Sequence, residues 1–272
     1  MTLDTRRFGD PGAVRAVAAE LRRVAPARDL TFMHVCGTHE NAIARHGLRR
    51  LLPPGLRVIA GPGCPVCVCP PTDIQMAVDL CRRPGVTVAT FGDMLRVPGR
   101  VSLEQARAAG GAVEVILGPH DAVELARAHP EREVVLLAVG FETTACTVAA
   151  AALADPPANL SFLVSHRVIP PALEALLALP DLRLDGFLLP GHVLTVTGVD
   201  AFRPFARRSG LPAVVAGFEP LDVLVGILQL TDLAARGRAV AVNAYRRAVR
   251  DRGNPAALGA LERAFCPVDA RW

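Results

Sequence analysis

The sequence Arg57-Val-Ile-Ala-Gly-Pro-Gly-Cys64-Pro-Val-Cys67-Val-Cys69-Pro70 joins a short apolar run to a loop that carries three cysteines. The run 57–60 has the length and composition of a buried β-strand. Proline and glycine in the loop restrict the backbone and remove N–H donors, so a rigid, exposed loop is favoured over a helix or a continuing strand. We therefore expect a strand whose carboxyl end leads directly into a group of thiols.

A second thiol, Cys36, follows a similar apolar run at 31–35 and opens the motif Cys36-Gly37-Thr38-His39-Glu40. A thiol between the end of a strand and the start of a helix lies beside free backbone N–H groups and the positive end of the helix dipole, which favour the thiolate. His39 and Glu40 could poise that thiolate or move protons. The alternative is that Thr38 and Glu40 only help to start the helix.

Short, continuously apolar runs alternate with stretches of helical periodicity along the rest of the chain. This alternation is typical of an α/β fold with parallel sheets that are covered on both faces. The expected strands are 31–35, 57–60, 86–90, 112–117, 134–139, 160–164, 185–189 and 213–217. The expected helices are 11–25, 39–50, 72–82, 102–109, 120–129, 143–154, 170–178, 200–209 and 220–235, and the stretch 221–265 is expected to be mostly helical.

Two stretches resemble each other: Phe91-Gly-Asp-Met-Leu-Arg-Val-Pro-Gly99 and Pro190-Gly-His-Val-Leu-Thr-Val-Thr-Gly198, with Gly92 and Gly191 separated by 99 residues. Chance matching of glycines is the alternative to an internal duplication. Duplication predicts two similar parallel-sheet α/β domains, at 1–130 and 131–235, followed by a helical C-terminal segment at 236–272. Ligands bind outside the carboxyl ends of such strands, so the two domains are expected to enclose a cleft.

Composition limits the function. Of the 272 residues, 51% are hydrophobic and 21% are charged. The net charge of +4 is spread along the chain and forms no basic tail, so the charge pattern does not indicate nucleic-acid binding. No apolar run approaches the roughly 18 residues that span a bilayer. The chain contains no lysine, which excludes a Schiff-base lysine and a Walker-type phosphate loop. Clustered cysteines with no signal peptide indicate the cytoplasm and metal or redox chemistry.

The spacing of Cys64 and Cys67 suits a shared metal ion or a small disulfide. A structural zinc site needs further ligands, and the nearby candidates are Cys36, Cys69 and Cys81. Cys69 could join the site or simply pack. Cys81 and Cys146 are interpreted as buried structural thiols, and Cys266 is left unassigned.

Several motifs, taken together and in order, resemble the HypD family of [NiFe]-hydrogenase maturation factors. They are Cys-Gly-Thr-His-Glu at 36–40, Gly-Pro-Gly-Cys-Pro-Val-Cys-Val at 61–68, Phe-Gly-Asp-Met-Leu-Arg-Val-Pro-Gly at 91–99, Gly-Phe-Glu-Thr-Thr-Ala at 140–145, Pro-Gly-His-Val at 190–193 and Gly-Phe-Glu-Pro-Leu-Asp at 217–222. The resemblance implies a scaffold for assembling a metal centre rather than a metabolic enzyme. With the small partner HypC, it would hold iron while two cyanides and a carbon monoxide are installed.

The resemblance also implies partners and site residues. HypE, supplied by HypF, would donate the cyanide, and the Fe(CN)2CO unit would pass to the hydrogenase large-subunit precursor. The iron thiolate would be Cys36, and Cys64 and Cys67 would form a redox-active pair. Beside what the resemblance implies, we expect His39 and Glu40 to move protons, and Gly37, Thr38, Glu142 and His192 to hold and orient the bound ligands. The alternative for His192 is a loop histidine with a structural role. His34 and His46 are expected to be structural.

The sequence departs from the family pattern at Cys69 and Cys146, where other residues are expected. It also stops at Trp272, before four cysteines that bind a [4Fe-4S] cluster in the family, so we expect either a truncated copy without the cluster ligands or a cluster segment that lies on another chain. Two alternatives stay open: a thiol–disulfide oxidoreductase without iron, and a structural zinc protein. Pro70-Pro71 separates the cysteine pair from the next helix, which weakens the oxidoreductase alternative, because such enzymes typically start a helix at the pair.

Overall fold

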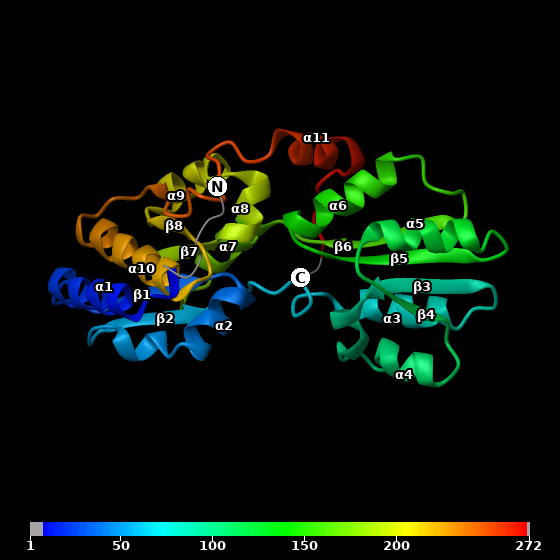
Figure 1. Ribbon diagram of the computed structural model, residues 1–272, viewed down its shortest axis with the longest axis horizontal. Coiled ribbons are helices and arrows are strands. Elements are labelled where there is room, and N and C mark those ends of the chain that lie inside the picture. The colour runs from blue at the N-terminus through cyan, green and yellow to red at the C-terminus, as the bar shows by residue number, and fades with distance from the viewer. Residues whose placement is uncertain (1–7, 271–272) are drawn as a thin grey trace. The chain divides into compact units, whose positions relative to one another are not determined.

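The computed structural model describes residues 8–270, and in it the chain forms two units (Figure 1). The first unit takes the chain up to Cys64 and then Ile169–Asn254, and the second takes Pro65–Val168 and the chain from Pro255 onward. These units differ from the expected boundaries at residues 130 and 235, because the chain leaves the first unit after Cys64 and returns to it at Ile169, about a hundred residues later. Trp272 lies outside the described residues.

The first unit is built on a parallel sheet in the order β2-β1-β7-β8-β9. In Figure 1 the blue strands β1 and β2 belong to the same sheet as the yellow-green β7 and β8, which come much later in the chain. The strands are β1 (Leu30–His34), β2 (Leu56–Ala60), β7 (Gly186–Pro190), β8 (Ala213–Ala216) and β9 (Ala241–Asn243). The helices are α1 (Pro11–Val24), α2 (Gly37–Arg45), α7 (Ile169–Leu177), α8 (Gly191–Thr197), α9 (Arg203–Ser209) and α10 (Pro220–Ala235), with short 3-10 turns at Leu48–Leu51 and Asp200–Phe202.

Alternate residues of each strand point to opposite faces of this sheet. Leu188 of β7 belongs to the core under α1, α2 and α10, together with Leu21 and Ile43. Its neighbour Phe187 points the other way and meets Phe205 of α9, with ring centroids 5.4 Å apart. Helices therefore cover both faces, as expected for a parallel sheet.

The second unit has a parallel sheet in the order β4-β3-β5-β6, and β5 shows the same alternation. Val135, Leu137 and Val139 pack under α3 and α4, while Val134 and Leu136 pack under α5 and α6. Helix α11 packs against α6. The elements are β3 (Val86–Phe91), β4 (Val113–Ile116), β5 (Glu133–Gly140), β6 (Leu160–His166), α3 (Pro71–Cys81), α4 (Leu103–Ala108), α5 (Pro119–Ala128), α6 (Glu142–Leu153) and α11 (Pro255–Ala264), with a 3-10 turn at Gly92–Arg96.

The prediction of an α/β fold with two parallel sheets is confirmed. Counted within each unit, both sheets begin with the strand order 2-1-3-4, which is consistent with an internal duplication. The predicted residue pairing is not: Gly92 follows the first strand of its sheet, whereas Gly191 follows the third strand of the other. The topological counterpart of Gly191 is Phe141, which follows the third strand β5. The predicted cleft stays a prediction.

Each predicted strand and helix is present within about two residues of its expected bounds, apart from breaks near Gly47 and Arg203, where short 3-10 turns join the helices. Two elements were not predicted, α8 and β9. Helix α8 is rich in β-branched residues, which favour strands. The prediction of a helical segment at 236–272 is wrong in its first half, because Ala241–Asn243 adds a fifth strand to the first sheet.

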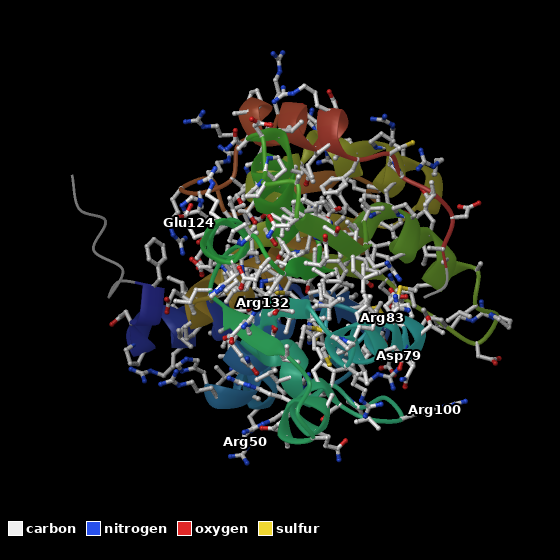
Figure 2. The ribbon with its side chains drawn as sticks, turned by 90° about the vertical axis from the view of Figure 1, so that its right-hand side faces the viewer. Arg50, Asp79, Arg83, Arg100, Glu124 and Arg132 are labelled. Carbon is white, nitrogen blue, oxygen red and sulfur yellow. The ribbon has the colours of Figure 1, made fainter. Side chains whose placement is uncertain are left out.

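The charged side chains labelled in Figure 2 are exposed on the surface of the unit to which each belongs. They include both signs, as in Asp79 and Arg83 of the second unit. None of the helices in residues 8–270 is both long and apolar enough to cross a membrane.

Candidate functional site

Cys36 lies at the carboxyl end of β1 and is the residue that precedes the first turn of α2. Its backbone is extended, and its side chain makes no capping hydrogen bond to the helix. The thiol is free and the residue is 9% exposed. Gly37 and Thr38, which follow it, are exposed. The Cys36 thiol is thus a free, buried group beside the amino end of a helix, next to two exposed residues.

The loop after β2 lies directly on this segment. Gly61 donates its backbone N–H to the carbonyl of His34 at 2.8 Å, and the carbonyl of Gly63 accepts the N–H of Gly37 at 3.2 Å. A Cβ atom at Gly63 would collide with the backbone nitrogen of Cys36. Only glycine fits at residue 63, because two backbone segments meet there. Cys64 is the next residue of the loop.

Cys64 and Cys67 are both disulfide-bonded. The other five cysteines of the chain are free, so these two are bonded to each other. Cys67 is exposed and Cys64 is half-buried. The pair can therefore be reached by a reductant or a partner protein, while its redox role stays a prediction.

Cys69, by contrast, packs in the core under α3. Its sulfur lies 3.6 Å from the hydroxyl of Ser165, which donates to a carboxylate oxygen of Asp73 at 2.6 Å. Burial raises the pKa of the Cys69 thiol. Of the two alternatives predicted for Cys69, the structure favours packing.

Removal of the Cys69 thiol should leave the Cys64–Cys67 disulfide intact and reversible, because that thiol is buried among apolar side chains and is mostly protonated. Thiol trapping followed by mass spectrometry of wild type and Cys69→Ala should give the same Cys64–Cys67 peptide after oxidation and its loss after mild reduction. An obligatory bridge from Cys69 to either cysteine in the wild type would contradict this assignment.

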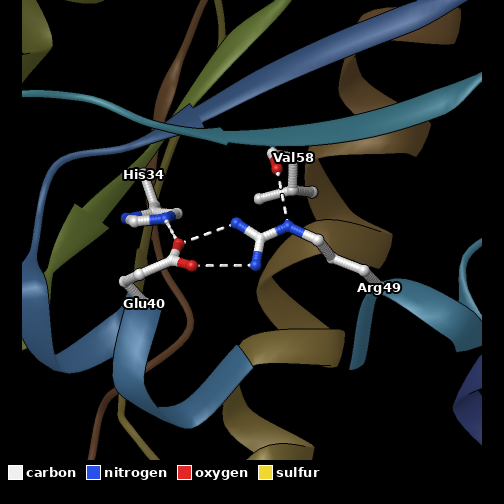
Figure 3. Close-up of polar contacts among 4 residues, drawn as sticks. All are labelled: His34, Glu40, Arg49 and Val58. Atoms are coloured by element: carbon white, nitrogen blue, oxygen red, sulfur yellow. Dashed lines mark hydrogen bonds and ion pairs between the residues drawn. The ribbon is translucent and has the colours of Figure 1, made fainter. Parts of the chain in front are cut away.

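Glu40 is held by two neighbours in the first turn of α2 (Figure 3). The guanidinium of Arg49 donates two hydrogen bonds to the carboxylate, at 2.9 and 2.7 Å, and also donates to the carbonyl of Val58 on β2 at 3.3 Å. On the other side, Nε2 of the buried His34 lies 2.7 Å from the carboxylate. The hydrogen bonds from Arg49 are the main cause that lowers the pKa of Glu40 to about 2. Glu40 is therefore charged at neutral pH and ties α2 to both strands.

Glu40 should contribute a pH-dependent part of the stability. Because its pKa is lower in the folded protein than the ordinary 4.5, this contribution is complete above pH 4.5 and is lost as the pH falls toward 2. The carboxylate is 37% exposed, so after allowance for solvent screening we expect about 1 kcal/mol. Urea unfolding at pH 7 and pH 3 should show a smaller pH difference for Glu40→Gln than for wild type. Glu104→Gln, which changes an exposed carboxylate in the second unit, is the control, and an equal pH difference in Glu40→Gln and wild type would contradict the role.

His39 is fully buried, and its Nε2 lies 3.0 Å from the carbonyl oxygen of Gly217 at the end of β8. A carbonyl only accepts, so Nε2 carries the proton and Nδ1 is bare. Nδ1 has no hydrogen-bond partner within residues 8–270. Burial lowers the pKa of His39 to about 4, against the opposing effect of the Gly217 carbonyl. The imidazole is thus neutral, with a free lone pair; the predicted proton transfer stays a prediction.

His192 is exposed at the start of α8, after β7. Its ring stacks on Phe218, with centroids 3.9 Å apart, and Phe218 in turn lies 4.8 Å from the ring of His39. Partial burial lowers the pKa of His192. The carboxyl ends of β1, β2, β7 and β8 therefore bring Cys36, His39, His192 and the Cys64 loop to one edge of the first sheet.

Glu142 was predicted to join this group. It belongs to the second unit, where it begins α6 after β5 and is 4% exposed. Its role at the site stays a prediction.

Four residues at the same sheet edge were not predicted to have a role: Phe218, Tyr245, and Asp222 with its ion-pair partner Arg247. Phe218 and Asp222 belong to the family motif Gly-Phe-Glu-Pro-Leu-Asp at 217–222. Tyr245 is the only tyrosine of the chain. It follows β9, so recognition of that short strand would have placed it at the sheet edge.

Within residues 8–270, no three His, Cys, Asp or Glu side chains come together in a way that could hold a metal ion by themselves. What the first unit offers is the free but buried thiol of Cys36 at a strand end, with polar and aromatic residues at the same sheet edge. Such a set suits a metal that arrives with other ligands already bound or about to bind.

The chain matches the family model HypD, described as "Hydrogenase formation hypA family", over residues 12–272. It is 46% identical over 269 residues to the Hydrogenase maturation factor HypD of Azotobacter vinelandii, which covers 95% of this chain and 71% of that protein. It is 42% identical over 264 residues to the HypD of Rhodobacter capsulatus, covering 93% and 70%. With the HypD of Escherichia coli (strain K12) the identity is 44% over 250 residues, covering 90% and 67%.

Proposed function

Since the chain belongs to the HypD family of hydrogenase maturation factors, we propose that it is a scaffold on which the iron of a [NiFe]-hydrogenase receives its diatomic ligands. Cys36 holds the iron while two cyanides and a carbon monoxide are installed. The pair Cys64 and Cys67 supplies electrons. The iron unit is cargo, which is assembled here and then passed on.

One observation carries this proposal: a free thiol at a strand end, with the loop of a disulfide pair packed on its backbone. The hydrogen bond from Gly37 to Gly63 fixes Cys36 and the start of the Cys64 loop relative to each other. A thiolate is a soft, strongly donating ligand that suits iron bound to cyanide and carbon monoxide. A single protein thiolate also leaves positions on the metal open for incoming ligands.

The surrounding residues have separate tasks. A dithiol at Cys64 and Cys67 releases two electrons and two protons when it closes to the disulfide. The bare Nδ1 of His39 can accept a hydrogen bond or a proton. Glu40 keeps its charge and orients the first turn of α2, with Gly37 and Thr38 leaving room above Cys36. Glu142 and His192 orient the bound ligands.

The partners follow from the same proposal. A HypC-type small protein supplies a second thiolate and carries the finished unit to the hydrogenase large-subunit precursor, and a HypE-type protein, charged by HypF, donates cyanide. The chain works in the cytoplasm, where thiols stay reduced.

A [4Fe-4S] cluster does not fit the described residues. Its ligands would be four cysteines brought together. The five free cysteines of this chain are scattered: Cys36 is at the end of β1, Cys69 and Cys81 lie in the core of the second unit, Cys146 is on α6 and Cys266 follows α11. No step is therefore assigned to a cluster on residues 8–270.

A thiol–disulfide oxidoreductase without iron is the second candidate. It is favoured by the exposure of Cys67, one of the two disulfide-bonded cysteines. The two functions separate after anaerobic co-expression with a HypC-type partner. We expect iron in the purified complex, with infrared bands of both cyanide and carbon monoxide. A complex with neither iron nor these bands would favour the oxidoreductase, and zinc in place of iron would favour a structural zinc protein.

A further inference from the structure

The segment after β9 forms a closed loop at the edge of the first sheet. The side chain of Asn243 accepts the backbone N–H of Tyr245 at 3.0 Å and donates to the carbonyl of Val249 at 2.8 Å. Val249 in turn donates its N–H to the carbonyl of Tyr245 at 2.9 Å. These bonds give residues 243–249 a defined shape and direct the Tyr245 ring toward the strand ends.

The Tyr245 ring lies against two bare glycines. A Cβ atom at Gly191 would lie 2.6 Å from Cδ1 of Tyr245, and one at Gly217 would lie 2.6 Å from Cε2 on the other edge of the ring. Gly191 immediately precedes His192, and Gly217 immediately precedes Phe218. The ring therefore touches the two turns that carry the histidine and the phenylalanine of the site.

Arg247 lies over the face of this ring. Its guanidinium lies 4.5 Å from the centroid of the Tyr245 ring and pairs with the Asp222 carboxylate through two hydrogen bonds, one of 2.6 Å. Asp222 is 6% exposed at its side chain and also accepts the N–H of Glu219 at the start of α10. A desolvated, bidentate pair of this kind is rigid, because its geometry is fixed by both partners.

The two turns under Tyr245 determine where the imidazoles lie. The carbonyl of Gly217 accepts a hydrogen bond from Nε2–H of His39, and the ring of Phe218 contacts the rings of both His39 and His192. We propose that Tyr245, held by Arg247 and Asp222, is a positioning residue that fixes His39 and His192 at the proposed iron site. The positioning of the two histidines does not depend on the proposed function. The expected effect of Tyr245 on iron retention rests on it.

The positioning is tested first in the protein without cargo. Nitrogen-15 NMR of the histidine rings should show, in Tyr245→Ala, loss of the hydrogen-bonded Nε2–H signal of His39 and a rise in the pKa of His192 as its stack loosens. Tyr245→Phe keeps the ring and should match wild type. Phe265→Ala is the matched control, because Phe265 lies 5.3 Å from the ring of His166 in the second unit and should change only that histidine.

The second measurement is iron retained with a HypC-type partner, which should fall about tenfold or more in Tyr245→Ala and return in Tyr245→Phe. If Tyr245→Ala does not fold, Tyr245→Leu, which keeps an apolar side chain on both glycines, should give the same changes to a smaller extent. Unchanged His39 and His192 signals in a folded variant overturn the proposal, as does full iron retention with altered signals. If wild type retains no iron, the proposed function fails, and the ring signals alone decide the positioning.

Discussion

Cys36→Ala should abolish retention of the iron unit while the fold survives. Cys36 makes no capping hydrogen bond, and its thiol is the one free sulfur that the structure places at the carboxyl edge of the first sheet. Loss of that thiolate removes the protein's bond to the metal. Loss of one sulfur at a loop position should change the free energy of unfolding by only about 1 kcal/mol.

The measurement is iron per chain and infrared absorption after anaerobic purification with a HypC-type partner, together with urea unfolding. Cys146→Ala is the control: Cys146 is also a free thiol near the start of a helix, although it is more exposed than Cys36, and its sulfur donates to the carbonyl of Thr143. We expect wild-type iron in the control and none in Cys36→Ala. The same bands in both variants would show that Cys36 is not the ligand.

Gly63→Ala should destabilise the protein severely and separate the two thiol loops. The new Cβ would collide with backbone atoms of Val35 and Cys36, which cannot move aside as a flexible side chain could. Overpacking of this kind typically costs about 1–3 kcal/mol, and a backbone collision belongs at or above the upper end. The hydrogen bond from Gly37 to Gly63 would be lost with it.

Gly37→Ala provides the control for this change. It lies on the other side of the same contact, but a Cβ atom there meets nothing within 4 Å. Its expected effect is within about 0.5 kcal/mol, because it starts a helix on an exposed surface. Urea unfolding of both variants should separate them clearly. Equal midpoints would mean that the two loops are not packed as described.

Local signals account for most of the fold that was predicted. The apolar runs before Cys36 and before Gly61 are long enough for a strand and too short for a helix, and the glycines and prolines after them end it. Each thiol loop was expected to follow the end of a strand, and Cys36 does follow β1 while the Cys64 loop follows β2. The motifs around these cysteines also indicate the HypD family, and the match to the family model and to its relatives confirms that membership.

The sequence could not indicate how the site is completed. Glu40 was predicted to move protons. The sequence did not indicate that Arg49, nine residues away, donates hydrogen bonds to its carboxylate and keeps it charged. His39 looked like a possible base beside Cys36, but its Nε2 is committed to Gly217, 178 residues along the chain. Partners of this kind have no fixed spacing in sequence.

The amino-acid sequence by itself determined the strands, the strand-end thiols, the α/β class and the family, because each depends on residues that are close together along the chain. The tertiary structure alone decided that β1 pairs with β7, that the first unit is interrupted by the second, and that Ala241–Asn243 becomes a fifth strand. It also decided that Tyr245 lies on Gly191 and Gly217. The physical reason is that these contacts form between surfaces created only when distant segments pack together, and no local period or motif records which segments those are.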